Sequence, residues 1–128
     1  MTEPVSEFKS KSGLGRILPA MSYAIAGLKA AYKHEHAFRQ ELVMVAIGTV
    51  VALVLPVSAY QKFFLVSVLV FVLIVELFNS AIEAIVDRVS LERHPLSKNA
   101  KDMGSAAVML SIFLAVACWG VVLFNRFY

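Results

Sequence analysis

The sequence has very little cysteine and none of the familiar nucleotide-binding loops, and each absence excludes something. With Cys118 alone, no disulfide can form within the chain. There is no G-x-x-x-x-G-K-[ST] loop and no G-x-G-x-x-G after a strand, so neither a P-loop nor a Rossmann site is available. Any nucleotide would have to be held by helix side chains.

Charge is missing from long stretches of the chain. Residues 42–61 and 103–125 contain no Asp, Glu, Lys or Arg, and 59% of the 128 residues are hydrophobic. This apolar fraction lies well above that of a soluble domain. We expect an all-α membrane protein with three spanning helices, at about 37–55, from 63 through 87, and at 103–125, with Pro56 breaking the chain after the first.

Basic residues predict the orientation of these spans. Of twelve Lys and Arg, six lie up to Arg39 and four in residues 88–101, whereas the 56–62 turn and the carboxyl end have one each. Basic loops stay on the cytosolic side, so we expect the N-terminus inside and the C-terminus outside. The first thirteen residues are polar and no short apolar core with a cleavage site follows, so we expect no signal peptide.

An amphipathic helix is expected before the first span. Apolar residues recur every three or four positions from Leu14 to Tyr32, with basic and polar residues elsewhere around the helix. We interpret this segment as a helix on the cytosolic membrane surface, kinked at Pro19. The predicted divisions are a polar tail at 1–13, the surface helix at 14–34, and a membrane domain at 35–128.

Carboxylates inside the second span are the strongest chemical signal. Glu76, Glu83 and Asp87 fall within about 20° of one line on a helix, flanked by Asn79 and Ser80. At about 1.5 Å per residue from residue 63, Glu76 lies about 20 Å into a core about 30 Å thick, and Glu83 lies near the cytosolic boundary. Because ionisable groups are costly in a bilayer, this row predicts a functional site.

More carboxylates converge at the same depth. Glu35 and Glu41 begin the first span, and Asp102 follows Lys101 before the third. Taken singly, acids at helix ends can be ordinary interfacial charges, but together they suit a hard cation such as Mg²⁺ and therefore a phosphate-handling site. A transition-metal site at 34–36 is disfavoured, because two His side chains two positions apart point to different sides of a helix.

Three motifs carry a family resemblance. The motifs resemble segments of the bacterial diacylglycerol kinase family and follow one another in the same order as in that family. They are EHAFRQE at 35–41, VELFNSAIEAIVDR at 75–88 and AKDMGSAAV at 100–108. The resemblance covers the chain from about Arg16 to its end. It implies a homotrimer with active sites between subunits, in the bacterial inner membrane, that uses ATP and Mg²⁺ to phosphorylate diacylglycerol to phosphatidic acid.

The resemblance also implies roles for particular residues. Glu76 would be the base for the lipid hydroxyl, Glu35 and Glu83 would bind Mg²⁺, and Asn79 and Lys101 would lie near the transferring phosphate. The nucleotide-contacting set it implies is Arg16, Tyr23, Glu35, Glu83, Glu92, His94, Lys101 and Asp102. The lipid-contacting set is Arg16, Glu41, Glu76 and Ser105, and Asp87 is a polar residue that shapes the site.

Two departures and three alternatives stand beside this interpretation. The surface helix lacks the tryptophans of some relatives, and Lys98 stands where some have glycine. The family includes undecaprenol kinases, and no residue decides the acceptor. A small proton-coupled transporter is a second alternative, but it would need acids reachable from both sides. The third, a non-enzymatic assembly subunit, leaves so many carboxylates at one interface unexplained.

Overall fold

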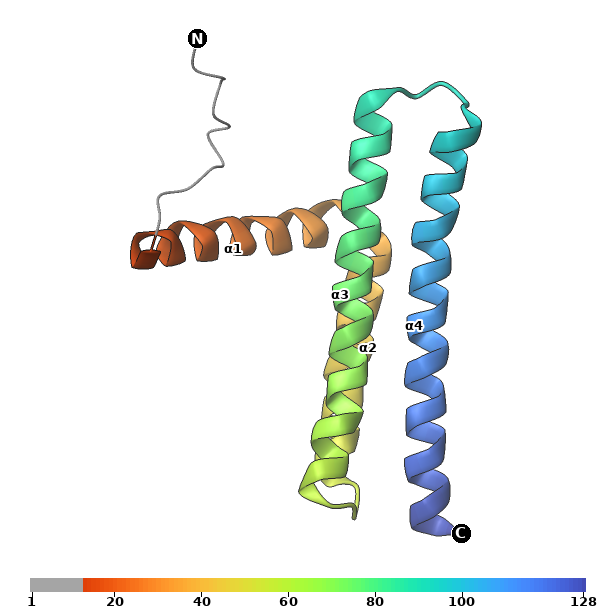
Figure 1. The fold of residues 1–128 in the computed structure, drawn as a ribbon. Helices are drawn as coiled ribbons and strands as arrows, with labels where there is room; N and C mark the ends of the chain where they lie inside the picture. The colour runs from red at the N-terminus through yellow and green to blue at the C-terminus, as the bar shows by residue number, and fades with distance from the viewer. Residues whose placement is uncertain (1–12) are drawn as a thin grey trace. The chain divides into compact units, whose positions relative to one another are not determined.

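The structure, a computed structural model, describes residues 13–128, and all of its regular elements are helices. Figure 1 shows them in chain order. They are a short 3-10 helix η1 (Gly13–Arg16), then α1 (Ile17–His34), α2 (His36–Val54), α3 (Ala59–Val89) and α4 (Pro95–Phe127). This confirms the predicted all-α fold with an N-terminal helix before three long apolar ones. The predicted polar tail, apart from Gly13, lies outside the described residues.

The chain divides into two compact units, one ending at His34 and the other comprising Glu35–Tyr128. In the first unit, α1 runs without interruption through Pro19, which occupies its first turn. There a backbone N–H has no helical partner, so proline fits without bending the helix. The apolar residues that repeat along α1 are exposed: Leu18, Met21, Ile25, Leu28 and Tyr32.

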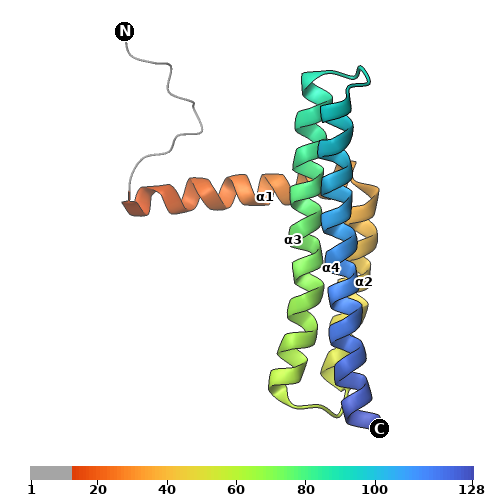
Figure 2. The ribbon, with the colours of Figure 1, turned by 45° about the vertical axis from the view of Figure 1, so that its right-hand side comes forward.

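In the second unit, α2 and α4 both pack against α3, which is the shared central helix. Figure 2 confirms that α3 and α4 lie side by side. All three helices are long and apolar enough to cross a membrane. At 1.5 Å per residue α2 is about 28 Å long, whereas α3 and α4 are about 46 Å and 50 Å. The two longer helices therefore exceed a hydrocarbon core of about 30 Å.

The turn between α2 and α3 is fixed by local chemistry. Pro56 cannot continue α2, and Ser58 starts α3 with a capping box, its side chain accepting the Gln61 N–H at 3.2 Å while Gln61 Oε1 accepts the Ser58 N–H at 3.0 Å. From α4, Arg126 Nε donates to the carbonyl of Pro56 at 2.6 Å. This bond joins the end of the chain to the same turn.

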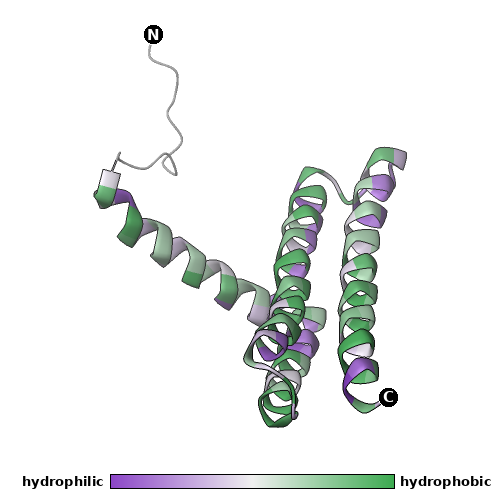
Figure 3. Ribbon diagram, turned by 60° about the horizontal axis from the view of Figure 1, so that its bottom comes forward, coloured by the Kyte–Doolittle hydropathy of each residue, from purple (hydrophilic) through white to green (hydrophobic). Residues whose placement is uncertain are grey.

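The α3–α4 interface is built from small residues on α4 and branched residues on α3. Gly104, Ser111 and Ala115 are buried on α4 and allow the two helices to approach closely. Nearer the carboxyl end of α4, Trp119 joins the two helices, because its indole N–H donates to the carbonyl of Leu65 on α3 at 3.1 Å. Figure 3 colours the middle of α4 mostly as hydrophobic, with hydrophilic residues toward its two ends. The buried apolar residues of this bundle are Phe38, Ala52, Leu65, Val68, Leu69, Val72, Ala115 and Val122.

Candidate active site

The α2–α3 hairpin sets which acids meet. Gly48 of α2 lies directly against the side chain of Leu69 on α3. In an antiparallel pair, each step back along α2 matches a step forward along α3. The same offset brings Glu41 level with Glu76, and Glu41 is indeed within electrostatic reach of Glu76. It also brings Glu35 to the level of residues 82–83.

Glu76 is the innermost carboxylate of α3. It is 4% exposed, although it lies in a helix that is apolar over most of its length. The Ser80 hydroxyl donates to its Oε1 over a long 3.4 Å, and Asn79 and Ser80 are buried beside it. Glu83, one turn beyond Asn79, is half-buried, and Asp87 is exposed. The predicted polar stripe therefore passes from the interior of the bundle to its surface.

Two buried oxygen atoms in this region have no hydrogen-bond partner among the described residues. They are Oε2 of Glu41 and Oδ1 of Asn79. A buried polar atom without a partner is costly, and most such atoms in folded proteins are paired. These two acceptors are consistent with a site that completes its hydrogen bonds with a ligand.

Glu35 occupies the junction at the start of α2. Its carbonyl accepts the N–H of Arg39 at 3.3 Å, but its side chain makes no capping hydrogen bond. The carboxylate is thus not used to start the helix. Both Glu35 and Glu83 lie within electrostatic reach of Glu76. The structure therefore brings together four of the predicted site residues, Glu35, Glu41, Glu76 and Glu83.

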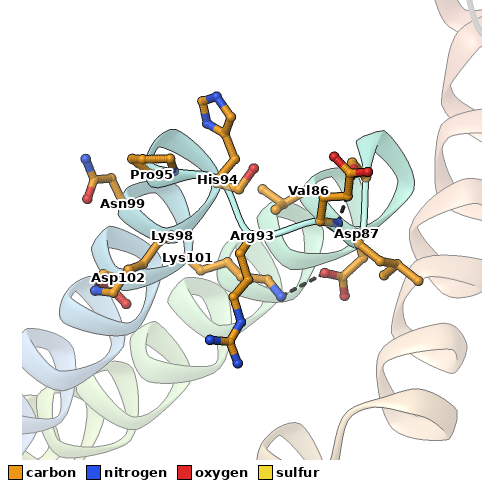
Figure 4. A pocket seen from close by; sticks show the side chains of 13 residues that line it. Val86, Asp87, Arg93, His94, Pro95, Lys98, Asn99, Lys101 and Asp102 are labelled. Carbon is orange, nitrogen blue, oxygen red and sulfur yellow. Dashed lines mark hydrogen bonds and ion pairs between the residues drawn. The ribbon is translucent and has the colours of Figure 1, made fainter.

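A pocket of about 800 Å³ lies where α3 ends and α4 begins. Lys101 of α4 crosses to Asp87 of α3, with Nζ and Oδ1 2.7 Å apart, while Lys98 pairs with Asp102 along α4. Figure 4 shows Lys101 and Asp87 facing each other, with the His94 ring directed away from them. His94 starts α4, because its Nδ1 accepts the N–H of Leu96 at 3.1 Å.

The predicted nucleotide contacts fall into separate groups. Those in the pocket are Glu92, His94, Lys101 and Asp102. Glu83 connects this group to the deeper carboxylates, since its charge acts on Lys101. Ser105, which is predicted to contact the lipid and not the nucleotide, is exposed on α4. Arg16 and Tyr23 belong to the first unit.

The charges of the pocket bear on what it can bind. Its lining has three basic and three acidic side chains: Arg93, Lys98, Lys101, Asp87, Glu92 and Asp102. These charges balance, so with the glutamates below them a polyphosphate would meet more negative charge than positive. Bound cations would remove this repulsion.

The donors fit Mg²⁺ better than a softer metal. Within residues 13–128 no three or more His, Cys, Asp or Glu side chains are grouped to hold a metal alone. Mg²⁺ needs only one or two carboxylates when substrate phosphates supply the rest. Glu35, whose carboxylate caps nothing, and the half-buried Glu83 are oxygen donors of this kind.

Some features of the site were not predicted. The hydrogen bond from Ser80 to Glu76 has a sequence signal, since residues four apart share a helix face. The role of His94 as a helix cap is signalled by Pro95, because proline favours the first helical position. Nothing in the sequence indicates that Arg93, Ser97 and Asn99 line the pocket.

The fold and the site together define a small polytopic membrane protein with an acid-lined site at one end of its spanning helices. Comparison with known proteins makes this specific. Residues 22–123 match the model of the family described as prokaryotic diacylglycerol kinase. The chain belongs to this family, as its motifs predicted.

Individual relatives agree along nearly the whole chain. A diacylglycerol kinase of Pseudomonas aeruginosa is 51% identical over 118 residues, which cover 92% of this chain and 96% of the relative. The diacylglycerol kinase of Escherichia coli K12 is 48% identical over 116 residues, covering 91% and 95%. That of Haemophilus influenzae is 37% identical over 113 residues, covering 88% and 96%.

Proposed function

We propose that this protein transfers the γ-phosphate of ATP to the hydroxyl of diacylglycerol, giving phosphatidic acid and ADP for phospholipid recycling. The observation that carries the proposal is the position of Glu76, buried among apolar helices at the inner end of a row of acids that reaches a polar pocket. In the proposed reaction the lipid hydroxyl reaches Glu76 from the bilayer side, and the soluble nucleotide enters from the pocket. Membership of the family supports the same reaction.

In the proposed reaction Glu76 is the general base. The hydroxyl oxygen forms a bond to the γ-phosphorus while the bond to the β,γ-bridging oxygen breaks, ADP leaves, and the hydroxyl proton passes to Glu76. The Ser80 hydroxyl holds one oxygen of that carboxylate. Such transfer depends mainly on positioning and charge neutralisation, and Lys101 and Asn79 would supply these near the transferring phosphate.

Mg²⁺ is the proposed cofactor, and Glu35 and Glu83 are the residues that would hold it. When bound, it neutralises phosphate charge. The repulsion between a polyphosphate and the local carboxylates supports this assignment.

The remaining residues divide between the two substrates in our proposal. Arg16, Tyr23, Glu92, His94 and Asp102 contact ATP, with Glu92, His94 and Asp102 doing so from the pocket lining. Arg16 also contacts the lipid. Glu41 and Ser105 contact the lipid head group, and Asp87 shapes the site by holding Lys101.

We also propose the setting in which the reaction occurs. The protein is a homotrimer of the bacterial inner membrane, with its N-terminus in the cytosol and its C-terminus outside. Its surface helix (14–34) follows a polar tail (1–13) and precedes the membrane domain (35–128). The basic residues around the acid-rich end support this orientation.

One experiment tests the function and its lipid alternative together. Purified protein in mixed micelles is given radiolabelled ATP with diacylglycerol and undecaprenol in equal amounts. We expect label in phosphatidic acid. Label chiefly in undecaprenyl phosphate would make the protein an undecaprenol kinase. No labelled lipid, with proton flux through proteoliposomes, would favour the transporter alternative.

A further inference from the structure

We propose that Gly104 is a positioning residue for Asn79: the missing side chain at position 104 gives the Asn79 amide its place beside Glu76. This inference rests on the proposed kinase function for its catalytic consequence.

The two residues meet across the α3–α4 interface. Asn79 is 8% exposed on α3, and Gly104 is buried on α4. A Cβ at position 104 would collide with Oδ1 of Asn79 and come within 3.3 Å of its Cγ, but it would stay 3.8 Å from the Cα. The last distance is an ordinary contact, so the two backbones need not separate. An added methyl group would therefore displace the Asn79 amide and leave the helix packing in place.

The Asn79 amide, which the added methyl group would displace, lies among the proposed catalytic residues. Asn79 lies one turn from both Glu76 and Glu83 on the same face of α3, between the proposed base and a proposed metal ligand. Its Oδ1 is buried and has no hydrogen-bond partner among the described residues. Because the Asn79 amide is held in place and its Oδ1 accepts no hydrogen bond from the described residues, it is positioned to bind a substrate group or to orient a residue that binds one.

Two other glycines of the bundle separate this role from general packing. A Cβ at Gly120 would meet nothing within 4 Å, so Gly120→Ala adds the same methyl group to α4 without a collision. A Cβ at Gly48 would collide with Leu69, an apolar residue of the core. Gly48→Ala is therefore a matched control: it introduces a steric clash of the same kind within the bundle, but with Leu69 and not with Asn79.

Kinetics in mixed micelles provide the first test. We expect Gly104→Ala to lower kcat by about 10-fold to 100-fold, since a displacement of about 1 Å in a catalytic group can cost about 10². The KM for ATP and the melting temperature should stay close to those of the wild type. Gly120→Ala should keep the wild-type kcat, and Gly48→Ala should lower the melting temperature while the folded fraction keeps its kcat.

A double-mutant cycle then asks whether Gly104 acts through Asn79. Adding Gly104→Ala to Asn79→Ala should cause no further loss of kcat, because the collision partner is gone. A wild-type kcat in Gly104→Ala, or the same fold-loss in both backgrounds, would overturn the inference.

A third measurement does not depend on activity. In ¹⁵N-labelled protein in detergent, Gly104→Ala should shift the Asn79 side-chain NH₂ resonances, and Gly120→Ala should not. Unshifted resonances in Gly104→Ala would refute the inference even if the wild type proved to be a kinase. If the resonances shift in Gly104→Ala but the wild type phosphorylates no lipid, the contact between Gly104 and Asn79 stands and the proposed function is rejected.

Discussion

Lys101 of α4 and Asp87 of α3 form an ion pair across the pocket, with Nζ and Oδ1 2.7 Å apart. Their side chains are 40% and 50% exposed, so water screens the pair and it contributes little to stability. Its consequence is positional. The pair holds the Lys101 ammonium near the half-buried Glu83, at the junction of the pocket and the deeper carboxylates.

The first prediction concerns this pair. Lys101→Met should lower kcat by about 10² to 10³, as expected for loss of one group that stabilises transition-state charge. Asp87→Asn keeps the lysine and loses only its tether, so its kcat should fall by less than about 10-fold, with an unchanged melting temperature. Steady-state kinetics with thermal melts of both variants make the comparison. Equal losses in the two variants would contradict the expectation that Lys101 keeps most of its effect without its tether.

The second prediction concerns magnesium. Glu35→Gln and Glu83→Gln should each shift the Mg²⁺ dependence of activity to higher concentration, because each removes an anionic oxygen that Mg²⁺ prefers. Excess Mg²⁺ should restore part of the rate. Glu41→Gln is the control, since it removes a nearby charge from a residue that we do not assign to the metal. Midpoints unchanged in both Glu35→Gln and Glu83→Gln would reject the assignment.

The third prediction concerns the fold alone. Trp119→Phe removes the indole N–H that donates to the Leu65 carbonyl at 3.1 Å and keeps an aromatic ring in the α3–α4 interface. The free energy of unfolding in detergent should fall by about 1 kcal/mol, typical of one hydrogen bond plus lost packing. Activity of the folded protein should not change. A large loss of kcat without destabilisation would show that this interface affects the site.

The sequence predicted the three spans because each has an apolar run of sufficient length. Two of the helices extend beyond their apolar runs at the start, because polar residues begin them. α4 begins at Pro95 and not near residue 103, since its first two turns are polar and are started by the His94 cap, which hydropathy does not detect. α3 begins at Ala59 and not at residue 63 because of the Ser58–Gln61 capping box.

The convergence of the glutamates was also predictable in part. Helical periodicity puts Glu76 and Glu83 on one face, and a tight hairpin requires α2 to run beside them. The contact between Gly104 and Asn79 was not predictable, because side-chain packing along α3 and α4, and not the short 90–94 connection, sets the register between them. The positions of Arg16 and Tyr23 relative to the site depend on how two separate units meet, which no local pattern encodes.

The central claim is that Glu76 accepts the proton of the lipid hydroxyl. The most direct measurement is the rate of radiolabelled phosphate transfer from ATP to diacylglycerol by purified Glu76→Gln, beside wild type and with matched folding and oligomeric state. The amide has nearly the same shape but cannot take the proton, so kcat should fall by about 10² or more while the KM for ATP changes little. A variant that keeps more than about a tenth of the wild-type rate, well above what loss of a general base allows, would contradict the account.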